Sequence, residues 1–290
     1  MSVLLENDHL HVKVNEKGAE LTSVKSKLTG LEYMWGVNPA YWAKSSPILF
    51  PIVGTLRNDS YLYKGKSYTL SRHGFAREMI FNVVNDDTNK ATFRLSSNEI
   101  TLEKYPFNFI LEISYEITES LLEVTYNVQN SGTDIMYFSI GGHPAFKVPL
   151  TDATNFEDHF LQFSEEENAP RWPIDSHGLI LDKPIPLLEN DSKLHLTHDL
   201  FNSDALVFKN LKSDQVSIKS DKHEHGLDLY FKGFPYLGIW SYKDADFVCL
   251  EPWCGIADSI SHQQNLVEKE GIEKLSPSGS WSISWKVRFY

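Results

Sequence analysis

The chain has 290 residues, of which 41% are hydrophobic and 23% are charged, an ordinary balance for a globular protein with a sizeable core. Its net charge of −12, and the lack of any run of lysine and arginine, argue against the basic surface that nucleic-acid binding needs. The first residues lack the features of a signal peptide, and the longest apolar run, PILFPIVG at 47–54, is too short to span a bilayer. We therefore expect a soluble cytoplasmic protein that has neither nucleic acid nor a membrane as partner.

Apolar and polar residues alternate with a period of two through most of the chain. The alternation begins with LHVKV at 10–14 and continues as pairs of short strands around polar turns at 61–70 and 81–97. It is longest at 109–128, and it returns at 281–289. This pattern predicts antiparallel strands that each bury one face.

Helical periodicity over three or more turns is absent. Only residues 198–206 and 265–274 have a pattern compatible with short helices, and residues 164–200 are expected to run over the surface. No linker divides the chain. We therefore predict an all-β fold, a large sandwich of packed antiparallel sheets that forms a single domain over residues 1–290.

Cysteine and histidine spacing gives little support for a metal centre. Cys249 and Cys254, five apart, fit neither a CxxC redox pair nor half of a zinc site, so two buried thiols are expected. Two pairs of histidines are spaced so that a strand would place both rings on one face: His9 with His11, and His223 with His225. Zinc needs a third ligand, so we predict no metal and no cofactor.

Four stretches interrupt the strand pattern with ionisable side chains beside glycine, proline or aromatic residues. They are PIVGTLRN with Arg57, SRHGFAR with His73 and Arg77, GGHPAF with His143, and LEPWCG with Glu251. Each alone is also explained by a structural residue. Together they offer a cation, two imidazoles and a carboxylate, the groups needed for acid/base chemistry on a neutral polar ligand. The paired carboxylates of a glycosidase remain an open alternative, whereas no GxSxG, GxGxxG or P-loop motif occurs.

The stretch SIGGHPAFKVPL raises the question of what His143 is aimed at. Glycine allows close backbone approach, and Pro144 cannot donate a hydrogen bond to a sheet, so we expect this strand end to direct His143 out of the sheet. Aromatic residues make up 13% of the chain and most belong to the core. Trp240 and Trp253 are the candidates to stack on the apolar face of a sugar ring.

At these four motifs the chain resembles the aldose 1-epimerase (galactose mutarotase) superfamily, and most closely its branch associated with lactose operons. SSPILFPIVGTLRN and YLYKGKSYTLSRHGFAR are similar to that branch throughout. GGHPAF stands where the family has NHxYF, and CLEPWCGIADS matches the family's late carboxylate strand. The similarity runs from about residue 3 to residue 289. It implies a mutarotase-type β-sandwich with a sugar cleft across one sheet.

The resemblance also implies roles for individual residues. Glu251 would be the general base and His143 the general acid, with the histidine protonated and the glutamate ionised at rest. His73 and Arg57 would contact the sugar. The family's sugar-binding aspartate is best matched by Asp204 in SDALVF, with a rival in Asp228 of HGLDLY.

The chain departs from the family at two points, and these changes concern which sugar is bound. The asparagine before the family's catalytic histidine is Gly142, and the terminal PG motif becomes SPSGS. The expected ligand is a small-molecule sugar or a sugar phosphate. A related branch of hexose-6-phosphate 1-epimerases also has an HGFAR-type segment, and Arg57 with Arg77, and Arg72 beside them, could hold a phosphate. A structural salt bridge by Arg77, a sugar-binding sandwich without catalysis, and a monomer or a homodimer all stay open.

Overall fold

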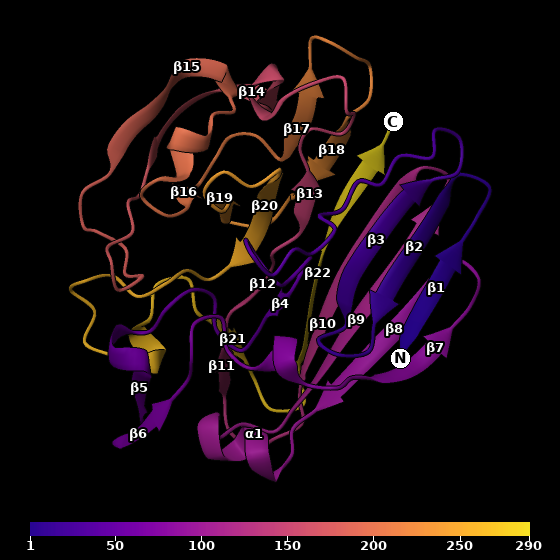
Figure 1. Ribbon diagram of the computed structural model, residues 1–290. Coiled ribbons are helices and arrows are strands. Elements are labelled where there is room, and N and C mark those ends of the chain that lie inside the picture. Colours follow the sequence, from indigo (N-terminus) through magenta and orange to yellow (C-terminus); the bar gives the residue numbers. More distant parts are fainter.

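The computed structural model describes residues 1–290, and its regular structure is mostly strands that pair antiparallel with their neighbours (Figure 1). The prediction of an all-β sandwich is confirmed. Two large sheets form the two layers, and three small sheets cover their edges and ends.

The larger sheet has nine strands. In spatial order these are β15 (Ile185–His195), β14 (His159–Arg171), β17 (Gln215–Ser220), β18 (Leu227–Tyr230), β22 (Ser280–Phe289), β10 (Leu121–Asn130), β9 (Phe109–Thr118), β8 (Lys90–Ser96) and β7 (Asn82–Asp86). Along β9 and β10 every second residue is buried, which is the period predicted from the sequence.

The second sheet has six strands and lies against the first. Its order is β16 (Leu206–Lys209), β19 (Tyr236–Trp240), β20 (Phe247–Cys254), β12 (Ile140–Gly142) and β4 (Ile48–Leu49), and β13 (Ala145–Lys147) also pairs with β20. All eight residues of β20 are buried, because the sheet is covered on both faces. This strand carries Glu251.

The remaining strands form three small sheets. They are β1 (Ser2–Glu6), β2 (Leu10–Asn15) and β3 (Glu20–Ser26); β5 (Ser60–Tyr63) and β6 (Lys66–Thr69); and β11 (Met136–Phe138) and β21 (Glu273–Leu275). Figure 1 shows the β1–β3 sheet lying beside β7 to β10. The Tyr115 hydroxyl on β9 donates a hydrogen bond to the Ala19 carbonyl, at 2.6 Å, and so ties this sheet to the larger one.

One hydrophobic core of 66 buried residues joins the layers and draws on the chain from Val3 to Phe289. Its largest side chains are aromatic and come from both large sheets. Where the layers meet behind β12, Trp285 Nε1 donates a hydrogen bond of 2.7 Å to Tyr126 Oη. Buried polar atoms of aromatic side chains need such partners, and this bond gives the Trp285 N–H its acceptor.

The helical content differs from the prediction in detail. The two predicted short helices are only 3₁₀ turns, at His198–Phe201 and Leu266–Glu268. The single α-helix, α1 (Glu99–Lys104), was not predicted, and the Asn98 side chain caps its first turn by accepting a hydrogen bond from Thr101 N. Its six residues are too few to show a helical period. Three further 3₁₀ turns lie at Arg57–Asp59, Ala76–Glu78 and Phe156–Asp158.

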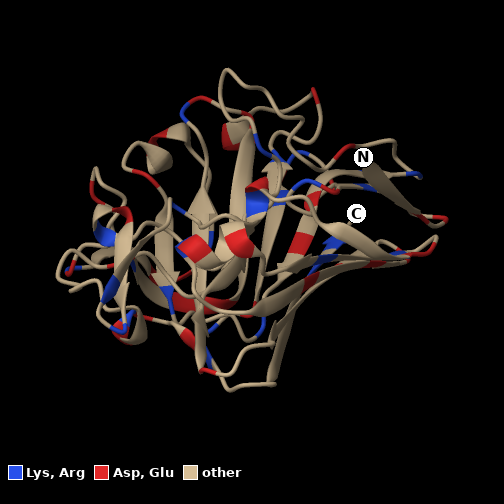
Figure 2. Cartoon of the chain, turned by 90° about the horizontal axis from the view of Figure 1, so that it is seen from below, with Lys and Arg blue, Asp and Glu red and all other residues tan.

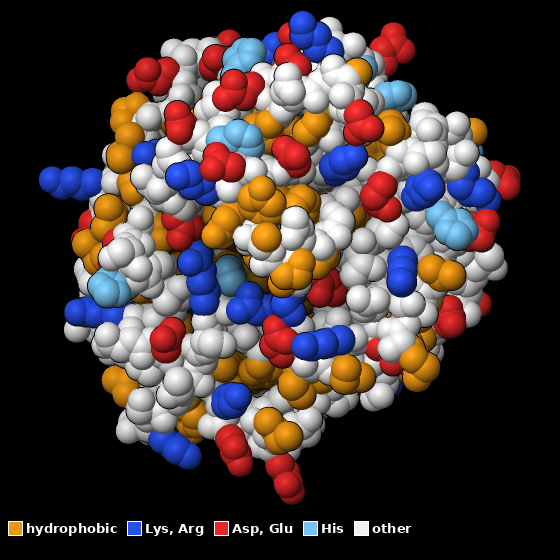
Figure 3. Space-filling model, viewed as in Figure 1, with side chains coloured by type: hydrophobic (Ala, Val, Ile, Leu, Met, Phe, Trp, Pro, Cys, Tyr) orange, Lys and Arg blue, Asp and Glu red, His pale blue; other side chains and the backbone are white.

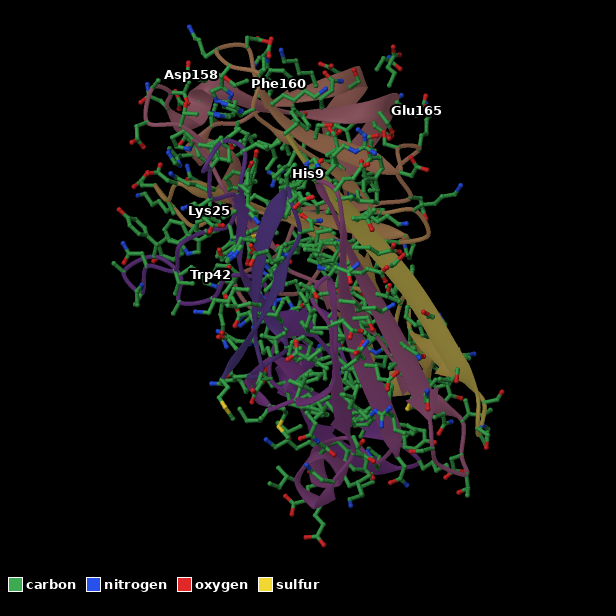
Figure 4. The ribbon with its side chains drawn as sticks, turned by 90° about the vertical axis from the view of Figure 1, so that its right-hand side faces the viewer. His9, Lys25, Trp42, Asp158, Phe160 and Glu165 are labelled. Atoms are coloured by element: carbon green, nitrogen blue, oxygen red, sulfur yellow. The ribbon has the colours of Figure 1, made fainter.

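The expected surface excursion at 164–200 contains regular structure. Its ends belong to β14 and β15, which pair as a hairpin at the edge of the nine-stranded sheet, at the top of Figures 1 and 4. Three register irregularities interrupt this pairing, which explains why no clean alternation is visible in the sequence. The loop between the two strands is exposed at Ser176, His177 and 182–184, whereas residues 178–180 are buried.

Charged residues of both signs are interspersed along the strands and loops (Figure 2). None of the helices has the length and apolar character that crossing a membrane requires.

Candidate active site

A cavity of about 320 Å³ opens on one face of the six-stranded sheet. Its floor comes from β19 and β20, and its walls come from the loops before β4, after β6 and between β14 and β15. Figure 3 shows blue and pale-blue side chains gathered around a hollow beside an apolar patch, near the end of β20. A volume of this size, with apolar walls and a few convergent polar groups, is typical of a small-molecule site.

His143 faces Glu251 because of strand register. β12 pairs Gly141 with Trp253, and β13 pairs Ala145 with Cys249, so the same register carried across the gap sets His143 opposite Glu251. In the gap between β12 and β13, Leu250 N of β20 donates a hydrogen bond to the Pro144 carbonyl. Pro144 itself has no N–H group, so it cannot donate a hydrogen bond to β20. Opposed residues of an antiparallel pair have neighbouring side chains. The Gly-Gly-His-Pro segment therefore aims His143 at a carboxylate across the strand pair.

The His143 and Glu251 side chains form a buried pair. His143 Nε2 lies 3.3 Å from Glu251 Oε2, and the two residues are 7% and 1% exposed. No hydrogen bond joins these two atoms. Glu251 Oε2 and His143 Nδ1 have no hydrogen-bond partner in the protein. Buried polar atoms are normally satisfied, so this pair presents unused hydrogen-bonding capacity at the cavity.

Burial favours the neutral form of both groups. It lowers the pKa of His143 from 6.5 to about 3, with the nearby Arg72 guanidinium adding to the shift. It raises the pKa of Glu251 well above 4.5, against a smaller lowering effect of Arg72. Both shifts act in the direction of a neutral imidazole beside a protonated carboxyl. Burial thus opposes the ion pair that the sequence analysis expected, because a dry cavity penalises two charges more than their attraction repays.

Aromatic rings line the cavity around His143. Trp42 stacks on the His143 ring with centroids 4.8 Å apart, and Trp240 meets the same ring edge-on at 5.7 Å. Trp253 lines the floor. Trp240 and Trp253 both line the cavity, and their stacking on a sugar ring stays a prediction. Trp42, which also lines the cavity, was not singled out from the sequence. Figure 4 shows Trp42 on the side of the molecule opposite the yellow β22.

His73 is held by the backbone of another motif. Gly54 N–H donates a 3.1 Å hydrogen bond to His73 Nδ1, so the proton of the neutral ring is on Nε2. The neutral form is favoured because burial, followed by the neighbouring His143, lowers the pKa of His73 well below 6.5. The two imidazole rings meet at right angles, 5.7 Å apart. The structure thus brings PIVG and SRHG together at the cavity.

Charged side chains stand at the cavity mouth. Arg72 and Asp204 approach to 3.3 Å with both side chains partly exposed, and Arg77 donates to the Arg72 carbonyl at 2.9 Å. Arg77 and Asp204 both line the cavity, and their contact with a sugar stays a prediction. Arg72 stands beside His73 in SRHGFAR, where it was considered only as an added phosphate ligand. The rival Asp228 is on β18 and accepts a hydrogen bond from Ser217 Oγ, in the other sheet.

Arg57 does not line the cavity, so its expected contact with the sugar is corrected. Its backbone N donates to Asp258 Oδ2, at 2.9 Å, and its guanidinium donates to the His262 carbonyl, at 3.1 Å. Asp258 also pairs with the buried Lys269. Arg57 instead lines a separate groove on the surface, together with Thr55, Asp59 and His177.

One group of side chains has spacing suited to a metal ion. His143, Cys249 and Glu251 place one ligand atom each within 4.8 Å of one another. His9–His11 and His223–His225 do not take part in such a group. Cys249 and Cys254 are free thiols and are buried, as expected.

Comparison with known proteins shows the family of the chain. A model of the aldose 1-epimerase family matches residues 1–269. The chain is 36% identical to the chromosomal protein LacX of Lactococcus lactis subsp. lactis, over 99% of both chains.

Solved structures give the same result. A galactose mutarotase related enzyme from Lactobacillus acidophilus superposes with a TM-score of 0.95 at 36% identity, covering 100% of this chain and 97% of the other. A galactose mutarotase-like protein from Lactobacillus casei gives a TM-score of 0.94 at 31% identity, with both chains fully covered. The chain belongs to the aldose 1-epimerase family.

Proposed function

We propose that the protein is an aldose 1-epimerase, an isomerase that interconverts the α and β anomers of a hexose by opening and reclosing its ring. The observation that carries the proposal is the pair of His143 and Glu251, an acid and a base 3.3 Å apart beside a sugar-sized cavity. Anomer exchange requires one group to accept a proton and another to donate one, and it needs no other reagent.

The chemistry balances on these two side chains. Glu251 as carboxylate takes the proton of the C1 hydroxyl, and the O–H electron pair forms the C1=O bond. The C1–O5 bond breaks, and O5 takes a proton from His143 as imidazolium. Rotation about C1–C2 turns the other face of the aldehyde to O5, and the same transfers in reverse close the ring. Each positioned proton transfer contributes roughly 10²–10⁴-fold.

The proton count explains how a neutral resting pair serves this reaction. Ring opening converts the Glu251 carboxylate and His143 imidazolium into a carboxylic acid and a neutral imidazole, and closure restores the charges. The second state is the one that burial favours. The pair therefore cycles between two arrangements of a single proton, and the cavity stabilises the arrangement that accompanies the open-chain sugar.

Neighbouring residues supply orientation. The Nε2–H of His73 and the carboxylate of Asp204 are a donor and an acceptor for sugar hydroxyls, and Arg72 holds the aspartate in place. Trp42, Trp240 and Trp253 offer ring faces. Holding the ring while it opens makes rotation possible without release.

The test is anomer exchange measured by NMR saturation transfer over glucose, galactose and their 6-phosphates. Wild-type protein should accelerate exchange for at least one sugar, and Glu251→Gln and His143→Asn should each abolish it while the circular dichroism spectrum stays unchanged. Near-normal exchange in either variant would overturn the assignment. Binding without any acceleration would instead favour a non-catalytic sugar-binding protein.

A hexose-6-phosphate 1-epimerase is the second candidate, because two guanidinium groups line the cavity. Arg72 and Arg77 are the residues concerned, and paired guanidinium groups bind phosphate well. Against this, Arg72 already faces Asp204, and Arg77 already donates to the Arg72 carbonyl. Faster exchange of a 6-phosphate than of its parent sugar would establish this candidate.

A further inference from the structure

A buried thiol lies beside the acid/base pair, and the proposed reaction makes no use of it. Cys249 is 0% exposed and comes two residues before Glu251 on β20, so the two side chains point to the same face of the sheet. The thiol is free, and Ala145, opposite it on β13, has no polar side-chain atom to bind it. Cys249 is therefore a third reactive side chain at the floor of the site.

The three side chains have the spacing of metal ligands. One ligand atom each of His143, Cys249 and Glu251 lies within 4.8 Å of the other two. His143 Nε2 and Glu251 Oε2 are 3.3 Å apart, and no hydrogen bond joins them. Two ligand atoms about 2.0–2.2 Å from one zinc ion lie roughly 3.3–3.6 Å apart when the coordination is tetrahedral. The nitrogen and the oxygen thus already have the separation of two zinc ligands, and the sulfur is near enough to become the third.

The charges of the three groups would balance a divalent cation. A thiolate and a carboxylate carry one negative charge each, and a neutral imidazole carries none, so the site with zinc would be neutral. A dry cavity penalises uncompensated charge, which makes this balance important. Burial lowers the pKa of His143 from 6.5 to about 3, so its ring keeps a free lone pair near neutral pH.

The donor set selects zinc over the hard cations. Thiolate and imidazole are ligands for zinc, whereas Mg²⁺ and Ca²⁺ take oxygen ligands. Burial, followed by the charge of Glu251, raises the pKa of the Cys249 thiol well above its usual value, so the free thiol is inert. A coordinated metal ion removes the proton of a thiol outright. Among these chemistries, only metal binding therefore brings Cys249 into use.

Three protein ligands leave the fourth position of a tetrahedral ion open. His143 and Glu251 line the cavity, so an ion would reach its ligands from there. We propose that a zinc ion binds His143, Cys249 and Glu251 and switches the site off, because it occupies the lone pairs that ring opening needs. Binding forms Zn–N, Zn–S and Zn–O bonds and releases the thiol proton, and the carboxyl proton where one is present, to the solvent. The ion would be an inhibitor and not a cofactor, and this inhibition rests on the proposed function.

Binding is tested on the full chain with Co²⁺ as the probe, after treatment with a chelator. Cobalt bound to a thiolate absorbs in the near ultraviolet, so the spectrum reports the sulfur ligand itself. Wild-type protein should show this absorption, and Zn²⁺ should remove it by displacement. Cys249→Ser should lack it, and Cys249→Ala is the second variant in case the buried hydroxyl disturbs folding. Cys254→Ser changes the other free thiol of β20, which belongs to the main core, and should keep the absorption.

Inhibition is tested by measuring anomer exchange at rising Zn²⁺ concentration, on the sugar that the wild type exchanges fastest. Zn²⁺ should inhibit, EDTA should restore exchange, and Mg²⁺ should have no effect. The concentration for half-inhibition should rise at least about tenfold in Cys249→Ser, because replacing residues that only support a metal ligand already weakens affinity by about 10–100-fold. It should stay unchanged in Cys254→Ser. Each variant is compared with itself without zinc, so a change in its basal exchange does not enter.

The outcomes separate the two proposals. If the wild type exchanges a sugar but shows no cobalt–thiolate absorption, or if Zn²⁺ inhibits wild type and Cys249→Ser alike, the zinc inference is overturned and the epimerase stands. Absorption without inhibition would also overturn it, because an ion on both the acid and the base must stop exchange. If no sugar is exchanged, the proposed function fails, and the cobalt spectra of wild type and the Cys249 variants decide the zinc site alone.

Discussion

His143, between β12 and β13, lies opposite Glu251 of β20, with Nε2 and Oε2 3.3 Å apart and both residues buried. The pKa of His143 falls from 6.5 to about 3, so the stability linked to this group is present above pH 6.5 and is lost as the pH falls toward 3. The pKa of Glu251 rises well above 4.5, so its linked stability is present below pH 4.5 and is lost as the pH rises through the folded value. The two groups therefore change the free energy of unfolding with pH in opposite directions.

Glu251→Gln should therefore change the pH dependence of stability. The substitution removes the contribution of the glutamate to the change of the unfolding free energy with pH, and it leaves the contribution of the histidine. Relative to the wild type, the free energy of unfolding of the variant should fall by up to about 1.4 kcal/mol per pH unit as the pH is lowered from 6.5 to 4.5. Chemical denaturation at several pH values measures this. Glu224→Gln, on the exposed surface, is the control, and its unfolding free energy should change with pH as that of the wild type does. The same pH dependence in Glu251→Gln would contradict the raised pKa of Glu251.

The two candidate sugar-binding aspartates can be told apart by matched substitutions. Asp204 stands at the cavity mouth beside Arg72, whereas Asp228 bonds Ser217 in the other sheet. Asp204→Asn should raise KM by about 10- to 100-fold, the loss of a hydrogen bond to a charged acceptor. Asp228→Asn should leave KM unchanged. Anomer exchange at varied sugar concentration gives both values, and an equal effect of the two variants would place the sugar elsewhere.

Much of the fold and of the site follows from the sequence, because strand alternation and the Gly/Pro contexts of the ionisable residues are local features. His73, His143 and Glu251 were identified in this way, and the structure brings them together at one cavity. Arg57 could not be placed correctly, because its position depends on a backbone hydrogen bond to Asp258, 201 residues away in the chain.

Trp42 was missed for a related reason. Its loop before β4 carries no alternation and no Gly/Pro-flanked charge, and its stacking on His143 joins residues about a hundred positions apart. Only the folded arrangement of loops around β20 shows that this tryptophan, unlike Trp281 on β22, covers the acid/base pair.

Trp42→Ala tests that covering role. Removing the stacked ring would admit water to His143, and better solvation should bring the pKa of His143 back toward 6.5. The acidic limb of the kcat profile should therefore move toward neutral pH, and kcat should fall. Trp281→Ala, which removes a half-buried ring packed on Phe138, is the control and should not shift the limb. An unshifted limb in Trp42→Ala would mean that the Trp42 ring does not shield His143 from water.

Gly142→Ala tests how tightly the backbone before His143 is packed. A Cβ at this position would lie 2.7 Å from Tyr126 Oη and 3.2 Å from Trp285 Nε1, and these two atoms are hydrogen-bonded to each other. Overpacking of this kind typically costs about 1–3 kcal/mol. We expect that loss in the free energy of unfolding, together with slower exchange, because β12 must shift and His143 is its next residue. Gly36→Ala, where a Cβ meets only open space, should cost nothing in either measurement. If Gly142→Ala proved as stable and as active as Gly36→Ala, close packing would not be the reason for glycine before His143, and the aim of the imidazole would have to be set from the Pro144 side alone.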